Sequence, residues 1–257
     1  YSVAKMVATL SCLYHRRVDL NMVAGGFKND LQALNDATPH DARYDRLVEY
    51  TTIVLGLLAG RAPVTFQGRF HSVTNVTLAP ALDPALAPRL TISGSSEAGV
   101  AAARALGGLS VKYPAPLAPG AAPPPPDENG YGIRVGIIAR PQREEAWATA
   151  RARFPEDRRG QLTHQLAMKV SDSSWHQQLS DVARTGDGSD TYWMVPFENY
   201  KTFCPYLVGT YDAVAEELGR YLATGCRFLI LDVPAGAEEF GHINTAIARA
   251  AASVGRL

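Results

Sequence analysis

The sequence has few cysteines, no long apolar run and no recognisable export signal. Its three cysteines lie far apart and form no CxxC pair, so they offer no disulfide framework and fit a reducing compartment. No stretch reaches the roughly 18 apolar residues of a membrane span, and no signal peptide is recognised. We therefore expect a cytoplasmic protein without membrane contact.

An excess of charge of either sign is also absent, because 25 Lys and Arg residues balance 25 Asp and Glu residues. A chain without a general positive field does not gather nucleic acid, so we expect no such partner. The six histidines show no HxxxH or HxH spacing, and we predict no metal site. The sequence also lacks a GxSxG elbow, a GxxxxGK[ST] loop and a GxGxxG turn after a strand.

What the sequence does contain is an alternation of short apolar strands and amphipathic helices. Hydrophobic residues make up 46% of the chain, which is enough for a full core. Strands are predicted at 18–23, 90–93, 109–113, 132–139 and 227–231, and helices at 3–14, 41–58, 97–106, 143–153, 213–224 and 237–254. This order implies parallel strands with crossover helices, in either a doubly wound sheet or a (β/α)8 barrel with only some of its strands present.

Four segments interrupt the alternation. Residues 64–73 alternate around a glycine and predict a surface hairpin, and residues 114–126 are rich in proline and predict a surface loop. The polar stretch 156–190 is predicted to be helical. The aromatic stretch 191–208 has no period, which is typical of a lid or binding loop, with an oligomer contact as an equal alternative.

Ser93-Gly94-Ser95-Ser96 lies at a predicted strand-to-helix junction. Gly94 lets a ligand approach the backbone, and Ser95 and Ser96 offer hydroxyl groups. The free N–H groups of the first helical turn point to the same place, so the pattern predicts a phosphate cradle. The alternative is an ordinary serine N-cap.

Two further segments carry candidate site residues. Asn21 ends a strand, and His40 and Tyr44 are four residues apart on one face of a helix start. Imidazole and phenol can both donate to phosphate oxygens, although a capping histidine and a packed tyrosine are the alternative. Arg134 lies inside an apolar strand, where a charge needs either a polar site or a structural carboxylate as its partner.

In order and spacing, these segments resemble the bacterial luciferase-like flavin monooxygenases, most closely the alkanesulfonate monooxygenase group. The stretches that carry the resemblance are 8–25, Pro39-His40-Asp41-Ala42-Arg43-Tyr44 with 49–51, Ser93-Gly94-Ser95-Ser96, and Gly132-Ile133-Arg134 with Glu144-Glu145-Ala146-Trp147. The resemblance covers nearly the whole chain. It implies an α/β fold of the TIM (β/α)8-barrel type, with about five of eight βα units (strands 4 to 8) in this chain.

The same resemblance implies how the chain is organised. Residues 1–257 are expected to form a single barrel domain that is N-terminally incomplete, with the hairpin on its surface and 156–208 as an insertion or lid. The first three βα units would lie either on a longer form of this chain or on another polypeptide.

The resemblance also implies a cofactor and its contacts. Reduced FMN (FMNH2) would be held by Asn21, His40, Tyr44, Gly94, Ser95 and Ser96. Arg134 matches an arginine at the substrate end of the pocket, while Tyr200 and the adjacent Lys201 fall where the sulfonate enzymes have a lid arginine. Two other family side chains are missing, because Gly136 stands in place of a histidine and Val233 falls near a tyrosine position. A larger or less charged substrate than a sulfonate is therefore favoured, such as an intermediate of secondary metabolism.

The implied activity is two-component oxygenation, in which a separate flavin reductase supplies FMNH2 and O2 oxygenates a small organic substrate. Arg134, Tyr200 and Lys201 are the candidate catalytic residues, and a homo-oligomer is expected. The alternatives are an F420-dependent oxidoreductase of the same superfamily, a non-catalytic barrel subunit that stabilises an active partner, and a phosphate-binding barrel without flavin.

Overall fold

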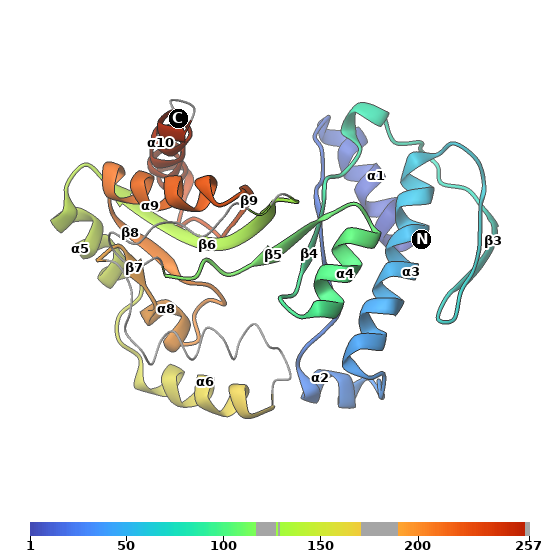
Figure 1. Ribbon diagram of the computed structural model, residues 1–257, viewed down its shortest axis with the longest axis horizontal. Coiled ribbons are helices and arrows are strands. Elements are labelled where there is room, and N and C mark those ends of the chain that lie inside the picture. Colours follow the sequence, from blue (N-terminus) through green and yellow to red (C-terminus); the bar gives the residue numbers. More distant parts are fainter. Residues whose placement is uncertain (117–126, 128, 171–189, 255–257) are drawn as a thin grey trace. The chain divides into compact units, whose positions relative to one another are not determined.

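The computed structural model describes residues 1–116, 127, 129–170 and 190–254 (Figure 1). The chain divides into two compact units, Tyr1–Ser110 and Val111–Leu257. In each unit, parallel strands alternate with helices, as the sequence predicts.

The first unit is built on two parallel strands, β1 (Leu20–Val23) and β4 (Leu90–Ser93), with Leu20 opposite Leu90 and Val23 opposite Ser93. Its other elements are α1 (Ser2–Tyr14), α2 (Lys28–Ala33), α3 (His40–Ala59), β2 (Val64–Gln67), β3 (Ser72–Val76), the 3₁₀ turn η1 (Pro84–Leu86) and α4 (Glu97–Ala105). One face of α3 packs on α1, and residues of α3, β4 and α4 form a second cluster. The carboxyl ends of β1 and β4 therefore lie side by side.

The helix α3 has the boundaries that its sequence dictates. It begins after Pro39 and ends at Gly60, whose φ of 59° is the left-handed conformation that glycine adopts easily. Tyr44 and Leu47 lie on its buried side near the start, and Val54 and Leu57 continue that side. The sequence prediction of 41–58 is confirmed to within one residue at each end.

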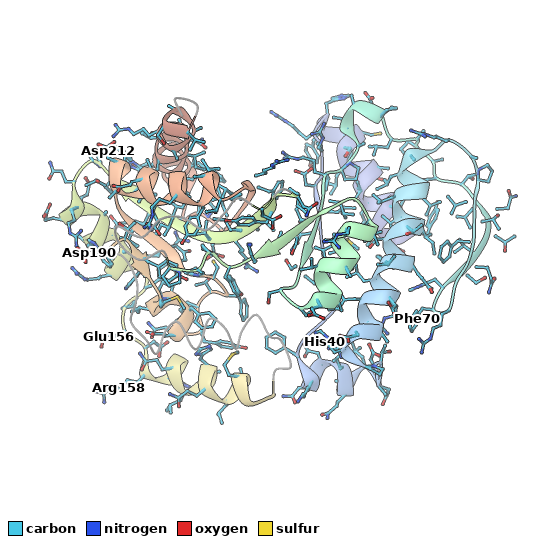
Figure 2. All side chains as sticks on the ribbon, viewed as in Figure 1. His40, Phe70, Glu156, Arg158, Asp190 and Asp212 are labelled. Atoms are coloured by element: carbon cyan, nitrogen blue, oxygen red, sulfur yellow. The ribbon has the colours of Figure 1, made fainter. Side chains whose placement is uncertain are left out.

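The predicted hairpin is present as β2 paired antiparallel with β3. Its turn is held from outside the hairpin, because the Glu49 carboxylate of α3 accepts hydrogen bonds from the backbone N–H groups of Arg69, Phe70 and His71 at 2.7, 2.8 and 2.9 Å. These three bonds lower the pKa of Glu49 although burial opposes them. Phe70 lies at this turn in Figure 2.

The second unit is organised around the long strand β6 (Tyr131–Arg140), which pairs in parallel with three other strands. Its first half pairs with β9 (Cys226–Leu231) and with the end of β5 (Leu109–Lys112), which straddles the unit boundary. Its second half pairs with β8 (Tyr206–Thr210), and β8 pairs antiparallel with β7 (Tyr192–Trp193). The helices are α5 (Arg143–Arg153), α6 (Arg158–Val170), α8 (Val195–Glu198), α9 (Tyr211–Ala223) and α10 (Ala237–Val254).

Both faces of β6 are covered, which explains its nearly continuous apolar sequence. Ile133, Val135 and Ile137 point into a cluster with α9 and α10, whereas Ile138 packs with α5 on the other face. Figure 1 shows α9 and α10 together over this strand. At its last residue, Arg140 makes a bidentate ion pair with Glu239 of α10 at 2.9 and 2.7 Å, and both side chains are buried.

The five predicted parallel strands are confirmed, and β4 has the predicted bounds. The prediction that 191–208 is irregular is wrong, because it contains β7, α8 and the first part of β8, and α2 was not predicted. The described strands do not close into a barrel. Most of the predicted loop 114–126, and residues 171–189 of the predicted lid, lie outside the described residues. No helix in the described part is long and apolar enough to cross a membrane.

Candidate functional site

Asn21 is the second of the four residues of β1, rather than the end of the strand as expected, and its side chain joins β1 to β4. Its Oδ1 accepts hydrogen bonds from the hydroxyl groups of Thr91 and Ser93, each at 3.0 Å. Because Asn21 lies directly opposite Thr91 in the parallel register, the amide is held in one orientation. Ligands of parallel α/β folds bind outside the carboxyl ends of the strands. Here those ends are Val23 and Ser93, and Ser93 is one of the two residues that hold the Asn21 amide.

Tyr44 of α3 and Gly94, the residue after β4, lie against each other. A Cβ built on Gly94 would overlap the phenol oxygen of Tyr44 and lie 3.0 Å from its Cζ. A Cβ on Gly99, in the first turn of α4, would likewise lie 3.2 Å from Cε1 of Tyr44. The two segments that the sequence analysis singled out separately therefore converge at the N-terminus of α4.

The first turn of α4 has the features of a serine cap. Ser96 is the N-cap residue, and its Oγ accepts a hydrogen bond from the backbone N–H of Gly99 at 3.2 Å. The alternative interpretation of Ser96 as a cap is therefore confirmed, and a cap leaves other N–H groups of the turn available to an anion. Ser95 and Ser96 are both half-buried beside the buried Gly94.

His40 lies in the first turn of α3, as Figure 2 shows, and its ring contacts Tyr44. The two ring centroids are 5.4 Å apart in an edge-to-face arrangement. Nδ1 of His40 lies 2.7 Å from a carboxylate oxygen of Asp41. Since a histidine ring has two nitrogens, this contact leaves Nε2 as the atom that can meet a ligand beside Tyr44.

In the second unit, Arg134 of β6 faces Asp232, the residue that follows β9. Nη2 of Arg134 lies 3.8 Å from Oδ1 of Asp232, and the backbone N–H of Asp232 donates to the carbonyl of Val135 at 3.1 Å. The expected carboxylate partner of Arg134 is thus present. Nε of Arg134 is buried and has no hydrogen-bond partner among the described residues.

Three side chains that the sequence analysis did not select surround this pair. The phenol of Tyr206 donates to Oδ2 of Asp232 at 2.6 Å, and burial raises the pKa of Tyr206, so the phenol stays protonated. Burial and then the Asp232 charge raise the pKa of the Cys204 thiol to about 11, which makes it a poor nucleophile. Burial also raises the pKa of Tyr113, on which Arg134 acts in the opposite direction.

Tyr200 and Lys201 lie elsewhere in the second unit, after α8. Nζ of Lys201 forms an ion pair with Asp157 at 2.7 Å, which lowers the pKa of that carboxyl. Tyr200 has a left-handed φ of 56° and packs on His164 and Phe203, with ring centroids 5.9 and 5.6 Å away. In the described part of the chain, none of these contacts joins Tyr200 or Lys201 to Arg134.

The candidate residues thus fall into two sets. The first set lies in the first unit, around Tyr44 and the N-terminus of α4, and is called the Tyr44 cradle below. Its members are Asn21, His40, Tyr44, Gly94, Ser95 and Ser96. Arg134, Tyr200 and Lys201 lie in the second unit. Across the described residues, no group of three or more His, Cys, Asp and Glu side chains could hold a metal ion.

Comparison with known proteins identifies the family of the chain. The sequence profile described as luciferase-like monooxygenase matches residues 1–227. The chain is 34% identical over 251 residues to the 4-(γ-L-glutamylamino)butanoyl-[BtrI acyl-carrier protein] monooxygenase BtrO of Niallia circulans, an alignment that covers 95% of this chain and 73% of BtrO. It is 33% identical over 96 residues to the FMNH2-dependent dimethylsulfone monooxygenase of Pseudomonas fluorescens (strain Pf0-1), which is 37% of this chain and 26% of that enzyme.

Among solved structures, the EDTA monooxygenase of Chelativorans sp. BNC1 superposes with a TM-score of 0.61 at 14% identity. The superposition covers 99% of this chain and 72% of that one. This likeness shows a shared fold, which in the luciferase-like family is the TIM-barrel type of α/β architecture that the sequence predicts. From the profile match and the similarity to BtrO, the chain belongs to the luciferase-like family of flavin-dependent monooxygenases and is an oxidoreductase.

Proposed function

We propose that this chain is the oxygenase of a two-component system, which uses FMNH2 and O2 to oxygenate a small organic substrate. The observation that carries the proposal is the contact between Tyr44 and Gly94 at the N-terminus of α4. It gathers a phenol and a half-buried serine, Ser95, around the free N–H groups of a helix start. BtrO and the dimethylsulfone enzyme, named as monooxygenases, support the same reaction class.

The residues of this cradle fit the phosphate of FMN. A phosphate needs several hydrogen-bond donors from different directions, and a helix N-terminus adds a favourable dipole. Tyr44 and Ser95 would donate from two sides, and Gly94 permits the approach because it has no Cβ. His40 would add Nε2 from the first turn of α3.

Bound FMNH2 would activate O2. The chain itself would bind and orient the flavin and shield the site from water. Asn21, held by Thr91 and Ser93, would fix the flavin at the edge of the parallel strands. Arg134 would meet negative charge on the substrate, because the buried Nε can donate one hydrogen bond. The segment 156–208, with Tyr200 and Lys201, would exclude water as an insertion over the site. A single N-terminally incomplete barrel domain over 1–257 also stays a prediction.

The surroundings of Arg134 favour a substrate of low charge. Its guanidinium already faces the Asp232 carboxylate, so less positive charge is left for a dianion such as a sulfonate. An uncharged or singly charged biosynthetic intermediate fits better, and BtrO by name oxidises an acyl group carried on a protein. A separate reductase would supply FMNH2, and a homo-oligomer is our expectation for the assembly.

Anaerobic titration with FMNH2 tests the proposal. We expect binding in the micromolar range, weakened about tenfold by Tyr44→Phe, which removes one donor to a charged group. Tyr14→Phe is the matched control, because Tyr14 is 68% exposed at the end of α1. Absence of micromolar binding by the unmodified chain would contradict the proposal. Flavin-dependent uptake of O2 separates it from the F420 alternative, since a deazaflavin does not activate O2.

A further inference from the structure

The aromatic ring of Tyr206 lies on Gly136, and this contact directs the phenol toward Asp232. A Cβ built on Gly136 would overlap the ring of Tyr206. Gly136 and Tyr206 are paired residues of the adjacent strands β6 and β8. Because position 136 has no side chain, the ring can lie flat across β6 and carry its hydroxyl beyond the strand.

The hydroxyl of Tyr206 then fixes one oxygen of the Asp232 carboxylate. The bond to Oδ2 is 2.6 Å long, and the Tyr206 side chain is 1% exposed. The backbone of Asp232 is fixed as well, because its N–H donates to Val135 of β6. A carboxylate held at both its backbone and one oxygen has a single direction left for the other oxygen.

That other oxygen, Oδ1, faces Nη2 of Arg134 at 3.8 Å. The thiol of Cys204 is fully buried, and the charge of Arg134 acts to lower its pKa against the larger effect of burial. Asp232 thus faces Nη2, and Nε is the buried donor without a hydrogen-bond partner in the described part of the chain. A second arginine, Arg153, lies over the Tyr206 ring, with its Cζ 5.7 Å from the ring centroid, and donates a hydrogen bond to the backbone carbonyl of Val233.

We propose that Asp232 is a positioning residue for Arg134, and that Tyr206, seated on Gly136, holds Asp232 in place. This inference rests on the proposed function, in which Arg134 meets the substrate. It adds that the orientation of the guanidinium, and so the direction of its Nε–H, is set by the carboxylate that follows β9 and by a phenol from β8.

Arginine-specific modification by phenylglyoxal, followed by mass spectrometry, tests the inference without flavin or substrate. Asp232→Asn keeps the shape of the side chain and removes its charge, and we expect it to speed modification of Arg134 about tenfold, as for loss of a charge-assisted contact. Tyr206→Phe should give a smaller increase of about threefold, because the carboxylate remains.

Asp212→Asn is the matched control. Asp212, labelled in Figure 2, lies on the same unit, and it forms an exposed ion pair with Arg249 at 2.6 Å. This variant should raise modification of Arg249 and leave Arg134 unchanged. The buried Arg140 reports on folding, because it becomes reactive only if the variant opens. If Asp232→Asn changes Arg134 by less than about twofold while Arg140 stays protected, the inference is overturned.

A spectroscopic measurement covers the case in which a variant is partly unfolded. In protein labelled with [¹⁵N]arginine, the Nε–H signal of Arg134, assigned with Arg134→Lys, should shift and broaden in Tyr206→Phe and stay in place in Asp212→Asn. An unchanged signal in Tyr206→Phe would also overturn the inference. FMNH2 binding by the unmodified chain is measured separately, so failure of the proposed function is distinguishable from failure of this assignment.

Discussion

The phenol oxygen of Tyr44 occupies the space that a side chain at Gly94 would need. The helix α3 and the turn after β4 are therefore packed against each other at one atom, beside the first turn of α4, where Gly99 also lies close to the Tyr44 ring.

The variant Gly94→Ala should displace Tyr44 and weaken the cradle. We expect a loss of about 1–3 kcal/mol in the free energy of unfolding from overpacking, together with weaker FMNH2 binding. Urea denaturation and anaerobic titration measure the two effects. Gly241→Ala is the control, because Gly241 lies in α10 with open space around it, and alanine there should stabilise by about 0.5–1 kcal/mol. Unchanged flavin affinity in Gly94→Ala would contradict the proposal that the Tyr44 cradle binds the flavin phosphate.

The two serines of the cradle should separate stability from binding. Ser96→Ala removes the side-chain cap of α4 and should lower the free energy of unfolding by about 1 kcal/mol. Ser95→Ala leaves that cap in place and should chiefly reduce FMNH2 affinity. Thermal melts and titration of both variants measure the difference. Equal loss of flavin affinity with no difference in melting would show that the two roles are assigned wrongly.

The buried pair of Arg140 and Glu239 should be costly to break on one side. Glu239→Gln leaves the buried guanidinium without its short carboxylate contacts and with the longer contact of its Nε to the exposed Glu145 carboxylate, at 3.8 Å. We expect a loss of about 3–5 kcal/mol in urea denaturation. The double variant Arg140→Met with Glu239→Leu should recover most of that loss, because no charge is left buried. Asp212→Asn, which breaks an exposed pair, should cost at most about 1 kcal/mol. A small effect of Glu239→Gln would mean that the pair is solvated.

Acid should destabilise the protein through His164. Burial lowers the pKa of His164, so the unfolded chain, with a histidine pKa near about 6.5, binds the proton more readily. The stability that depends on a neutral His164 is therefore present above that pH and is lost as the pH falls. Urea denaturation at about pH 7.5 and about pH 5.5 should show a smaller acid loss in His164→Phe than in the unmodified chain. The exposed His15, changed to Asn, should leave the loss unchanged.

Much of the fold was predictable because its signals are local. The strand before Gly94 is short and apolar, and Ser96 caps the helix that follows. The C-terminal boundary of α3 follows from Gly60, and the extent of α3 and α10 follows from hydrophobic period. These patterns need no knowledge of which elements pack together.

The strand β8 was missed because its signal is not local. Tyr206 and Leu207 are surrounded by aromatic and irregular sequence, and they form a strand through pairing with β6. Asp232 was missed as a site residue for the same reason, although its place directly after a predicted strand was a usable signal. Its partner Tyr206 could not be identified while β8 was assigned as loop.

The strand β6 is divided between two partners, β9 and β8. Residues 131–135 are paired with β9, whereas residues 136–140 are paired with β8. The segment between α5 and α9 therefore pairs with β6 at its C-terminal end, through β8. A change in the length or content of this segment would therefore leave Arg134 in register with β9.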